Sequence, residues 1–171
     1  YCLFSDCSGL SSITIPNSVT SISDEAFSNC SSLTSISIPD SVTSIGFRVF
    51  SGCSSLMSIN IDEANESYKS IDGIVFSKDE KKLIVYPAGN GTAYVIPDSV
   101  TSIESQAFNG CKHLTSIAFA KDSQISSIGV SAFYACSSLT SITIPSSVTI
   151  IDDSAFRSCI NLTCVTFADN S

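Results

Sequence analysis

Charged side chains are scarce in this chain, and basic ones are the scarcest. Only 14% of the residues are charged, and 16 acidic residues against 8 basic ones give a net charge of -8 at pH 7. A protein that binds nucleic acid or an anionic membrane surface presents a basic patch, so we expect neither as a partner. No apolar run approaches the roughly 18 residues of a membrane span, so we expect no membrane insertion.

Side chains that support catalysis or metal binding are also few. The single histidine, His113, follows no recognisable motif, no serine lies in a G-x-S-x-G context, and no glycine-rich phosphate loop follows an expected strand. Asp62–Glu63 and Asp152–Asp153 are sequence neighbours rather than facing carboxylates, and we interpret them as surface charge, with a weak Ca²⁺ contact as the alternative. The cysteines show no Cys-x-x-Cys spacing. We therefore predict no enzymatic activity, no cofactor and no metal.

One pattern fills the chain instead. Segments that begin at Cys7, Cys30 and Cys136 are near copies with a period of 23 residues; the copy at Cys111 is a 25-residue version, and Cys159 begins another. A period of about 20–50 residues indicates a solenoid, in which each coil buries its apolar face only against its neighbours. We predict one solenoid over residues 1–171, with about six or seven coils. Both ends fall inside the pattern, so we expect a piece of a longer protein whose flanking repeats cover the end coils.

Each repeat contains one clear strand. In residues 33–39, Ile36 and Ile38 alternate with serines, which is the period of a strand with one buried face. Pro39 ends the strand because it cannot donate to a ladder. We expect equivalent strands to stack in parallel about 4.8 Å apart, and the segment before each cysteine to form a short helical or 3₁₀ turn. The same stacking predicts a single aromatic column made of Phe27, Phe50, Phe108, Phe133 and Phe156.

The cysteines occupy one position of the repeat. Six of them share it: Cys7, Cys30, Cys53, Cys111, Cys136 and Cys159. We interpret this row as buried small apolar residues, because a free cysteine packs like one. Disulfides between neighbours stay open as an alternative, since the Cα spacing allows them although parallel Cβ vectors do not favour them. Cys2 and Cys164 lie off the row, and Cys164 falls on an outward strand position.

The full pattern, CxxLxxIxIPxSVTSIxxxAFxxC, resembles the BspA-type leucine-rich repeat, also called the Treponema pallidum type. The resemblance covers essentially the whole chain. It implies a curved solenoid with the LxxIxI strands as a parallel sheet on the concave face and short turns or 3₁₀ segments on the convex side. Proteins of this type are typically surface or secreted proteins of host-associated bacteria and of protists, and the family is implicated in adhesion to host proteins or other cells.

The stretch from Cys53 to Gly110 departs from the simple period. Two apolar runs, Tyr68–Phe76 and Leu83–Pro87, flank a polar tip at 77–82, which predicts a β-hairpin. We place this insert at about residues 68–92. It resembles a recurrent BspA-type variant, DGxxFSKDxxxLxxYP. The pattern resumes after it, at 93–97.

Two surfaces are candidate binding sites. On the concave face the outward side chains are small and mostly polar: Ser12, Thr14, Ser35, Ser37, Ser58, Asn60, Ser116, Ser141 and Thr143. They form either a solvated face or a docking surface for a protein or a glycan; rows of hydroxyls that order water, as on ice-binding sheets, are a third interpretation. On the hairpin, four of the eight basic residues gather, namely Lys69, Lys78, Lys81 and Lys82. They form either a contact patch for an acidic partner or a solvated tip that protects a sheet edge.

These features predict a non-enzymatic protein-binding or adhesion module, located outside the cell or on its surface. The expected partner is a host extracellular-matrix or cell-surface protein, or a glycan. The alternative is a structural spacer whose parent protein binds its ligand elsewhere. Four sequons, at Asn29, Asn65, Asn90 and Asn161, would accept glycans only in a secreting eukaryote.

Overall fold

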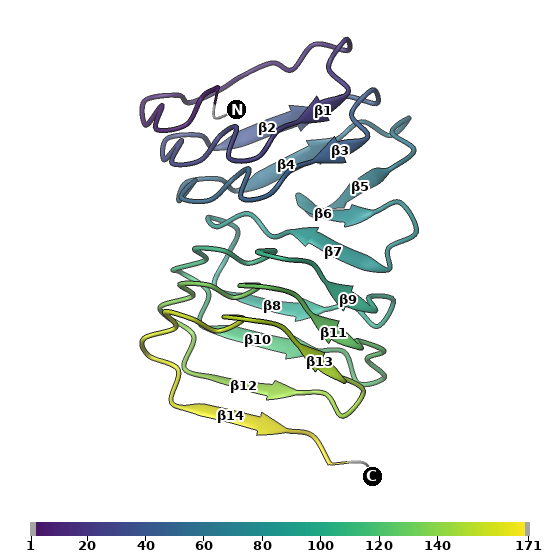
Figure 1. Cartoon of the computed structure of the whole chain (residues 1–171), viewed down its shortest axis with the longest axis vertical. Coiled ribbons are helices and arrows are strands. Elements are labelled where there is room, and N and C mark those ends of the chain that lie inside the picture. Colours follow the sequence, from purple (N-terminus) through teal and green to yellow (C-terminus); the bar gives the residue numbers. More distant parts are fainter. Residues whose placement is uncertain (1–2, 170–171) are drawn as a thin grey trace.

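The computed structural model describes residues 3–169, which contain strands and turns but no helix. The chain winds as a solenoid in which each regular coil contributes one four-residue strand and one two-residue strand (Figure 1). The four-residue strands are β2 (Ser35–Ile38), β4 (Ser58–Ile61), β8 (Ala93–Ile96), β10 (Ser116–Phe119), β12 (Ser141–Ile144) and β14 (Cys164–Phe167). The two-residue strands are β1 (Ser21–Ile22), β3 (Ser44–Ile45), β9 (Ser102–Ile103), β11 (Ser127–Ile128) and β13 (Ile150–Ile151).

The four-residue strands alternate as predicted. In β2 the two isoleucines are buried and the two serines are exposed. β2 pairs with β4 in parallel, residue for residue, from Ser35 with Ser58 to Ile38 with Ile61. Isoleucines therefore stack on isoleucines inside the solenoid, and small polar side chains stack on one another outside it.

The segment before each cysteine is a run of turns rather than a short helix. We call these segments the outer turns; they are residues 24–29, 47–52, 105–110, 130–135 and 153–158. Each has two residues with positive φ, for example Glu25 (55°) and Asn29 (59°) in the first. Outer turns of adjacent coils are joined by three backbone bonds: the N–H groups of Glu25, Phe27 and Asn29 donate to carbonyl oxygens of the next coil at 2.7–3.1 Å.

The cysteine row is made of buried free thiols. All seven cysteines that the structure describes are free, and Cys30, Cys53, Cys111, Cys136 and Cys159 are buried. Each buried thiol donates to the carbonyl oxygen of the aromatic residue in the preceding coil, as from Cys53 Sγ to Phe27 O (3.0 Å). The buried-thiol interpretation is confirmed for five of the six cysteines of the row and is wrong for Cys7. The bonds to the aromatic residues add a reason for cysteine over alanine. Cys7 and Cys164 are exposed, and Cys2 lies outside the described residues.

The aromatic column is interrupted, which corrects the prediction of a single one. Phe27 and Phe50 stack with ring centroids 5.8 Å apart, and Phe4 extends this first column. A second column runs from Tyr86 through Phe108 and Phe133 to Phe156, with centroids 4.9–5.1 Å apart. No ring contact joins Phe50 to Tyr86 in the described part of the chain.

The insert causes this interruption. It contains three antiparallel strands, β5 (Tyr68–Ile71), β6 (Ile74–Ser77) and β7 (Lys82–Val85), and so makes two consecutive hairpins. β7 then pairs in parallel with β9, which places the insert within a six-stranded sheet.

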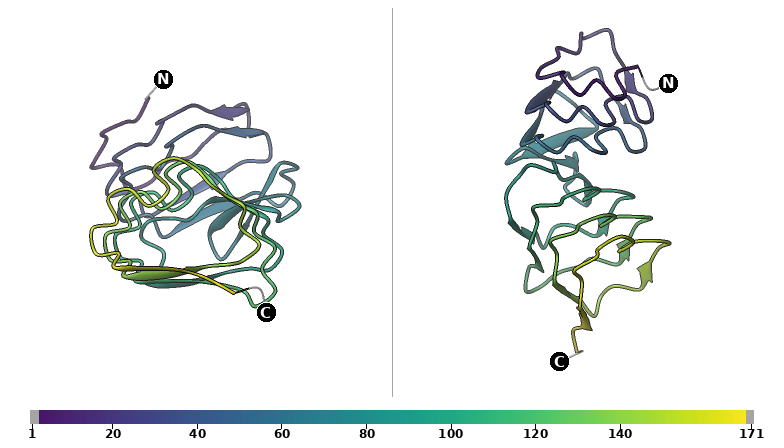
Figure 2. Two further views of the ribbon diagram at one scale, coloured as in Figure 1. Left: turned by 60° about the horizontal axis from the view of Figure 1, so that its bottom comes forward. Right: turned by 90° about the vertical axis from the view of Figure 1, so that its left-hand side faces the viewer.

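Strand β6 lies between two hydrophobic cores. Val75 packs in the N-terminal core, whereas Ile74 and Phe76 pack in the C-terminal core, and all three are buried. In a view close to the solenoid axis the C-terminal coils superimpose, and the N-terminal coils are displaced from them (Figure 2). The insert thus divides the solenoid into two regular stacks.

Candidate functional site

The outward side chains of the four-residue strands, together with Ser12 and Thr14, form a surface that we call the serine face. Of the predicted concave-face residues, all are exposed except Ser58, which is half-buried. The turn between β5 and β6 lies against it: a Cβ on Gly73 would come within 2.7 Å of the Ser58 Cβ. The predicted residues thus all lie on the outward side of the four-residue strands or, for Ser12 and Thr14, of the coil before them.

The serine face has three sections. Within residues 3–169, backbone pairing joins β2 to β4, β8 to β10 and β12 to β14, but not β4 to β8 or β10 to β12. The middle section is apolar, since Val95 is 59% exposed and Ala93 and Ala118 are exposed. At the last section, the hydroxyls of Thr143 and Thr166 lie 2.9 Å apart. A hollow of about 760 Å³ lies where β10 and β12 separate.

Three of the four hairpin lysines are bound within the chain. Lys69 Nζ lies 2.6 Å from Glu80 Oε1, and Lys82 Nζ lies 3.6 Å from Glu104 Oε1. Lys78 Nζ donates to two backbone carbonyls at 2.5 and 3.1 Å, one of them that of Asn65.

The fourth lysine, Lys81, is exposed, and its side chain has no ion pair or hydrogen bond to another described residue. The four lysines do gather on the insert, as the sequence indicates, but on two hairpins: Lys69 lies in β5, and the other three lie at the β6–β7 turn or in β7. Lys78 and Lys82 attach the insert to the coils around it, whereas Lys69 pairs with Glu80 inside the insert.

Asn65, the second sequon asparagine, is a structural residue. Its side chain is fully buried, and its amide nitrogen donates to Pro39 O (3.0 Å) and Val42 O (2.9 Å). Its amide oxygen accepts from the N–H groups of Ser67 (2.9 Å) and Tyr68 (2.8 Å). A glycan has no access to this nitrogen in the folded protein.

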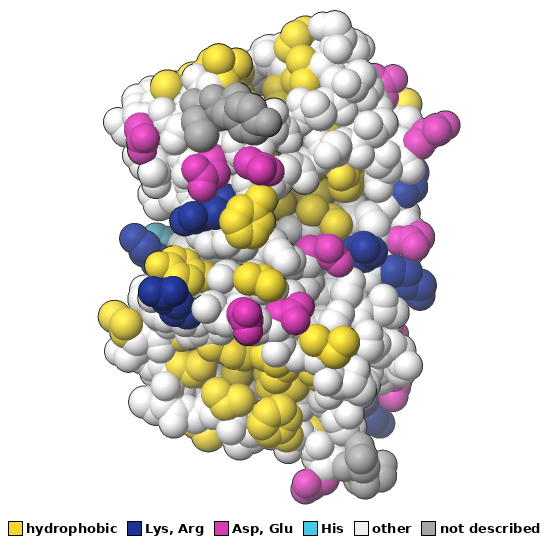
Figure 3. Space-filling view, viewed as in Figure 1, with side chains coloured by type: hydrophobic (Ala, Val, Ile, Leu, Met, Phe, Trp, Pro, Cys, Tyr) yellow, Lys and Arg dark blue, Asp and Glu magenta, His cyan; other side chains and the backbone are white. Residues whose placement is uncertain are grey.

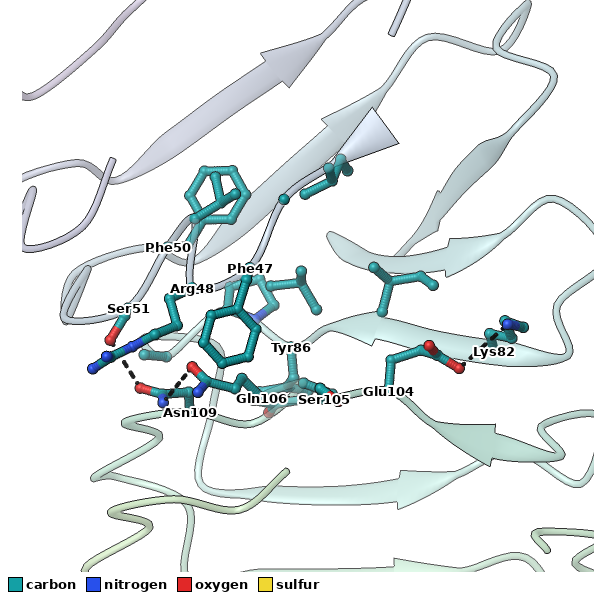
Figure 4. Close-up of a pocket in the computed structure, with 18 of the residues that line it drawn as sticks. Phe47, Arg48, Phe50, Ser51, Lys82, Tyr86, Glu104, Ser105, Gln106 and Asn109 are labelled. Carbon is teal, nitrogen blue, oxygen red and sulfur yellow. Dashed lines mark hydrogen bonds and ion pairs between the residues drawn. The ribbon is translucent and has the colours of Figure 1, made fainter. Parts of the chain in front are cut away.

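A feature that the sequence did not reveal lies on the side opposite to the serine face. Between the outer turns 47–52 and 105–110 there is a cavity of about 440 Å³, which we call the outer-turn cleft (Figure 4). Leu83 and Ala93 of the insert coil pair with Ile103 and Ser116 of the next, regular coil. Ser116 lies thirteen residues after Ile103, whereas Ala93 lies only ten residues after Leu83. The insert coil therefore lacks a full outer turn, and the cleft occupies its place.

A hydrogen bond closes one end of the cleft, and an ion pair lies toward the other end. Ser51 Oγ donates to Asn109 Oδ1 (3.1 Å) at one end, and the Lys82–Glu104 pair lies toward the other (Figure 4). Tyr86 lines the floor, and burial raises the pKa of its hydroxyl to about 12. The tyrosine is therefore a neutral donor at physiological pH, not an acid or base.

Potential metal-ligating side chains do not gather within residues 3–169. No group of three or more histidine, cysteine, aspartate or glutamate side chains is placed to hold a metal ion there. The same residues include no helix of the length and hydropathy that a membrane span requires.

Comparison with known proteins gives the family and the fold. The model of the BspA type leucine rich repeat region matches residues 1–92 and 85–171, with six copies. A leucine-rich repeat protein from Eubacterium ventriosum is 24% identical with a TM-score of 0.77, over 98% of this chain and 56% of that one. The pneumococcal vaccine antigen PcpA is 24% identical with a TM-score of 0.69, over 94% and 51%.

A third solved structure is slightly closer in sequence. A leucine rich cell surface protein from Faecalibacterium prausnitzii is 29% identical with a TM-score of 0.52, over 99% of this chain and 62% of that one. The chain thus spans between half and two thirds of these three solved chains, and no curated protein matched it. The repeat pattern, the stacked coils and a family model that covers both stacks lead to one conclusion: the chain belongs to the BspA-type leucine-rich repeat family.

Proposed function

We propose that this chain is a non-enzymatic protein-binding module of a cell-surface or secreted protein, and that it docks its partner on the serine face. The observation that carries the proposal is the make-up of that face, where small uncharged side chains surround exposed apolar ones. Val95 is 59% exposed in β8, and Met57, one residue before β4, is 62% exposed. The Faecalibacterium relative, described as a cell surface protein, supports the location.

A protein interface needs a small entropic cost and a few strong anchors. Small side chains lose little rotamer entropy when a partner covers them. Binding energy comes mainly from a few well-buried anchors, and serine alone supplies none. Met57 and Val95 supply apolar surface at the β4–β8 junction, where the Asp72–Gly73 turn interrupts the sheet. We therefore place the centre of the interface at this junction, with the serine rows as its periphery.

The partner class is an extracellular-matrix or cell-surface protein, or a glycan carried on one. The test is a binding screen of the chain against such proteins, with the double variant Met57→Lys/Val95→Lys beside it. Ser54→Lys is the matched control, because Ser54 is exposed but lies outside the serine face. We expect saturable binding that the double variant weakens at least tenfold and the control retains.

A second variant tests the hairpin. Lys81→Ser/Lys82→Ser removes charge but leaves Lys78, whose bonds to backbone carbonyls hold the insert in place. Binding that is lost in this variant and kept in Met57→Lys/Val95→Lys would move the site to the hairpin. Absence of binding to every protein in the screen would favour a spacer role.

A further inference from the structure

We propose that the outer-turn cleft is a second recognition site, which binds a short, uncharged peptide segment of a partner protein with an aromatic side chain at its centre. The segment lies beside Tyr86, which is all that the insert coil keeps of the regular outer-turn bonding to the next coil, and supplies the part of the outer turn that this coil lacks. This site lies opposite to the serine face and does not depend on the proposed function of that face.

The first wall of the cleft offers unused backbone donors. In the regular stacks, the N–H groups at three alternate positions of each outer turn bond to the next coil, as Ser131, Phe133 and Ala135 do at 2.8–3.0 Å. The same three positions in the outer turn 47–52 are Arg48, Phe50 and Gly52, and their N–H groups have no partner among residues 3–169. Phe50 is only 7% exposed, and a backbone donor in such a place needs an acceptor.

The second wall offers unused acceptors. In a regular outer turn three carbonyl oxygens accept from the preceding coil. In the outer turn 105–110, Ala107 O accepts from Tyr86 N (2.7 Å), whereas the oxygens of Ser105 and Asn109 accept from no described residue. One wall therefore donates and the other accepts. A peptide that runs in the direction of the coils can accept from the first wall and donate to Ser105 O or Asn109 O of the second, while Tyr86 N keeps the middle position at Ala107 O.

The lining favours an apolar, aromatic centre. The two aromatic columns end at Phe50 and Tyr86, and both of these residues line the cleft. Ile84 and Val85 are half-buried in its lining, and Phe47, 45% exposed, reaches from its first wall toward Gln106 (Figure 4). An aromatic side chain of the bound segment would lie between the two columns and contact the rings at their ends.

The charges around the cleft are already paired. Lys82 pairs with Glu104, and Arg48 Nη1 lies 3.5 Å from Glu25 Oε1. Charged side chains of both signs lie across the middle of this face, beside exposed hydrophobic ones (Figure 3). An uncharged segment leaves these pairs intact. The volume of about 440 Å³ also falls within the roughly 300–1,000 Å³ of typical ligand pockets.

A peptide copied from one of the regular outer turns can serve as the probe for the cleft. The peptide acetyl-Val-Ser-Ala-Phe-Tyr-Ala-amide copies residues 130–135, an outer turn that both donates and accepts the full set of bonds in its own coil. We expect its addition to the ¹⁵N-labelled chain to shift the amide signals of Arg48, Phe50 and Gly52 saturably and to slow their hydrogen exchange. A peptide with alanine in place of phenylalanine should bind at least tenfold more weakly.

Variants of the cleft complete the test. Replacing residues 84–92 with a copy of 104–115 restores a full outer turn, and Val85→Trp fills the floor with a single change; each should abolish the shifts while the protein stays folded. Val130→Trp is the matched control, because Val130 occupies the repeat position of Phe47 but lies outside the cleft. The serine-face variant Met57→Lys/Val95→Lys should bind the peptide as the parent chain does, which separates this site from the proposed function.

Two results would overturn the proposal. One is undiminished binding to both cleft-filled variants. The other is a set of shifts confined to Ser154, Phe156 and Ser158, whose N–H groups are also without a described partner at the last outer turn. In that case the peptide would only be extending the end of the solenoid.

Discussion

Replacing Asn65 tests how the insert is held between the two stacks. Its amide makes four hydrogen bonds at 2.8–3.0 Å from a fully buried position. Each net hydrogen bond contributes about 0.5–1.5 kcal/mol, and a buried partner left unsatisfied costs about 1–3 kcal/mol. Some of the four partners will regain water when the side chain is removed, so we expect Asn65→Ala to cost about 3–5 kcal/mol. That is a large part of the roughly 5–15 kcal/mol that stabilises a typical domain.

The near-isosteric change Asn65→Asp adds a pH signature. The carboxylate keeps the two bonds from Ser67 and Tyr68 but faces the carbonyl oxygens of Pro39 and Val42 without a donor. Its folded-state pKa must therefore rise above the unfolded value of about 3.9. Since the folded state holds the proton more tightly, the variant is penalised least below about pH 3.9, and the penalty grows as the pH rises toward the folded pKa.

The assay is urea denaturation of the parent chain and both variants at pH 4 and pH 7, with the free energy of unfolding obtained by linear extrapolation. Asn17→Ala is the control, because Asn17 is exposed and its side chain has no hydrogen bond to another described residue. A loss below about 1 kcal/mol for Asn65→Ala, against the 1–3 kcal/mol expected for a single unsatisfied partner, would refute the structural role. An equal penalty for Asn65→Asp at the two pH values would refute the placement of the carbonyls.

Three further predictions follow from the repeat. Phe133→Ala should cost about 3–5 kcal/mol, because the ring lies fully buried between rings 4.9 and 5.1 Å away; a thermal shift near zero would contradict the column. Ala135→Gly should raise stability by about 0.5–1 kcal/mol in the same denaturation assay, since alanine holds a left-handed φ of 57° there, and no gain would argue against that backbone. Iodoacetamide at pH 8 should label Cys7 and Cys164 in the native protein but not Cys53, because burial raises the pKa of its thiol to about 12; mass spectrometry that finds Cys53 modified before unfolding would refute its burial.

The regular coils could be predicted from the sequence because their determinants are local. The alternation in residues 33–39 and the recurrence of cysteine fix which side chains face inward, and the structure follows both. The buried run of Ile74, Val75 and Phe76 was also predictable as a strand. Its contact with two different cores was not, because that depends on which coils lie on either side of it.

Two residue patterns in the insert indicate its structure more closely than the prediction of one hairpin did. Asp72 and Gly73 both have positive φ, at 52° and 77°, and this dipeptide is a strong signal for a two-residue hairpin. Residues 68–76 therefore form two strands and a turn, not one apolar run. Tyr86 occupies the aromatic position of its coil, but no cysteine sets its register, so an alignment on cysteine passes over it.

Other features of the insert have no local signal. The pairing of Lys69 with Glu80 depends on how the two hairpins of the insert fold onto each other, and that of Lys82 with Glu104 on how the insert meets the next coil. The outer-turn cleft results from three residues that one coil lacks and from the strands added beside it. Neither follows from composition or from the period of the repeat.

The contrast between regular coils and an irregular insert affects how a partner can recognise this solenoid. A regular stack presents nearly the same side chains at each step of about 4.8 Å, so a partner that contacts only regular coils finds several equivalent positions, one coil apart. The insert removes that equivalence. Val95 and the Asp72–Gly73 turn each occur once, and both lie where the two stacks meet. The unpaired donors of Arg48 and Phe50 lie there too, and in residues 3–169 outer-turn donors without a partner recur only at the last outer turn. A partner that needs a defined position on this solenoid must therefore contact that junction, and both proposed sites include it.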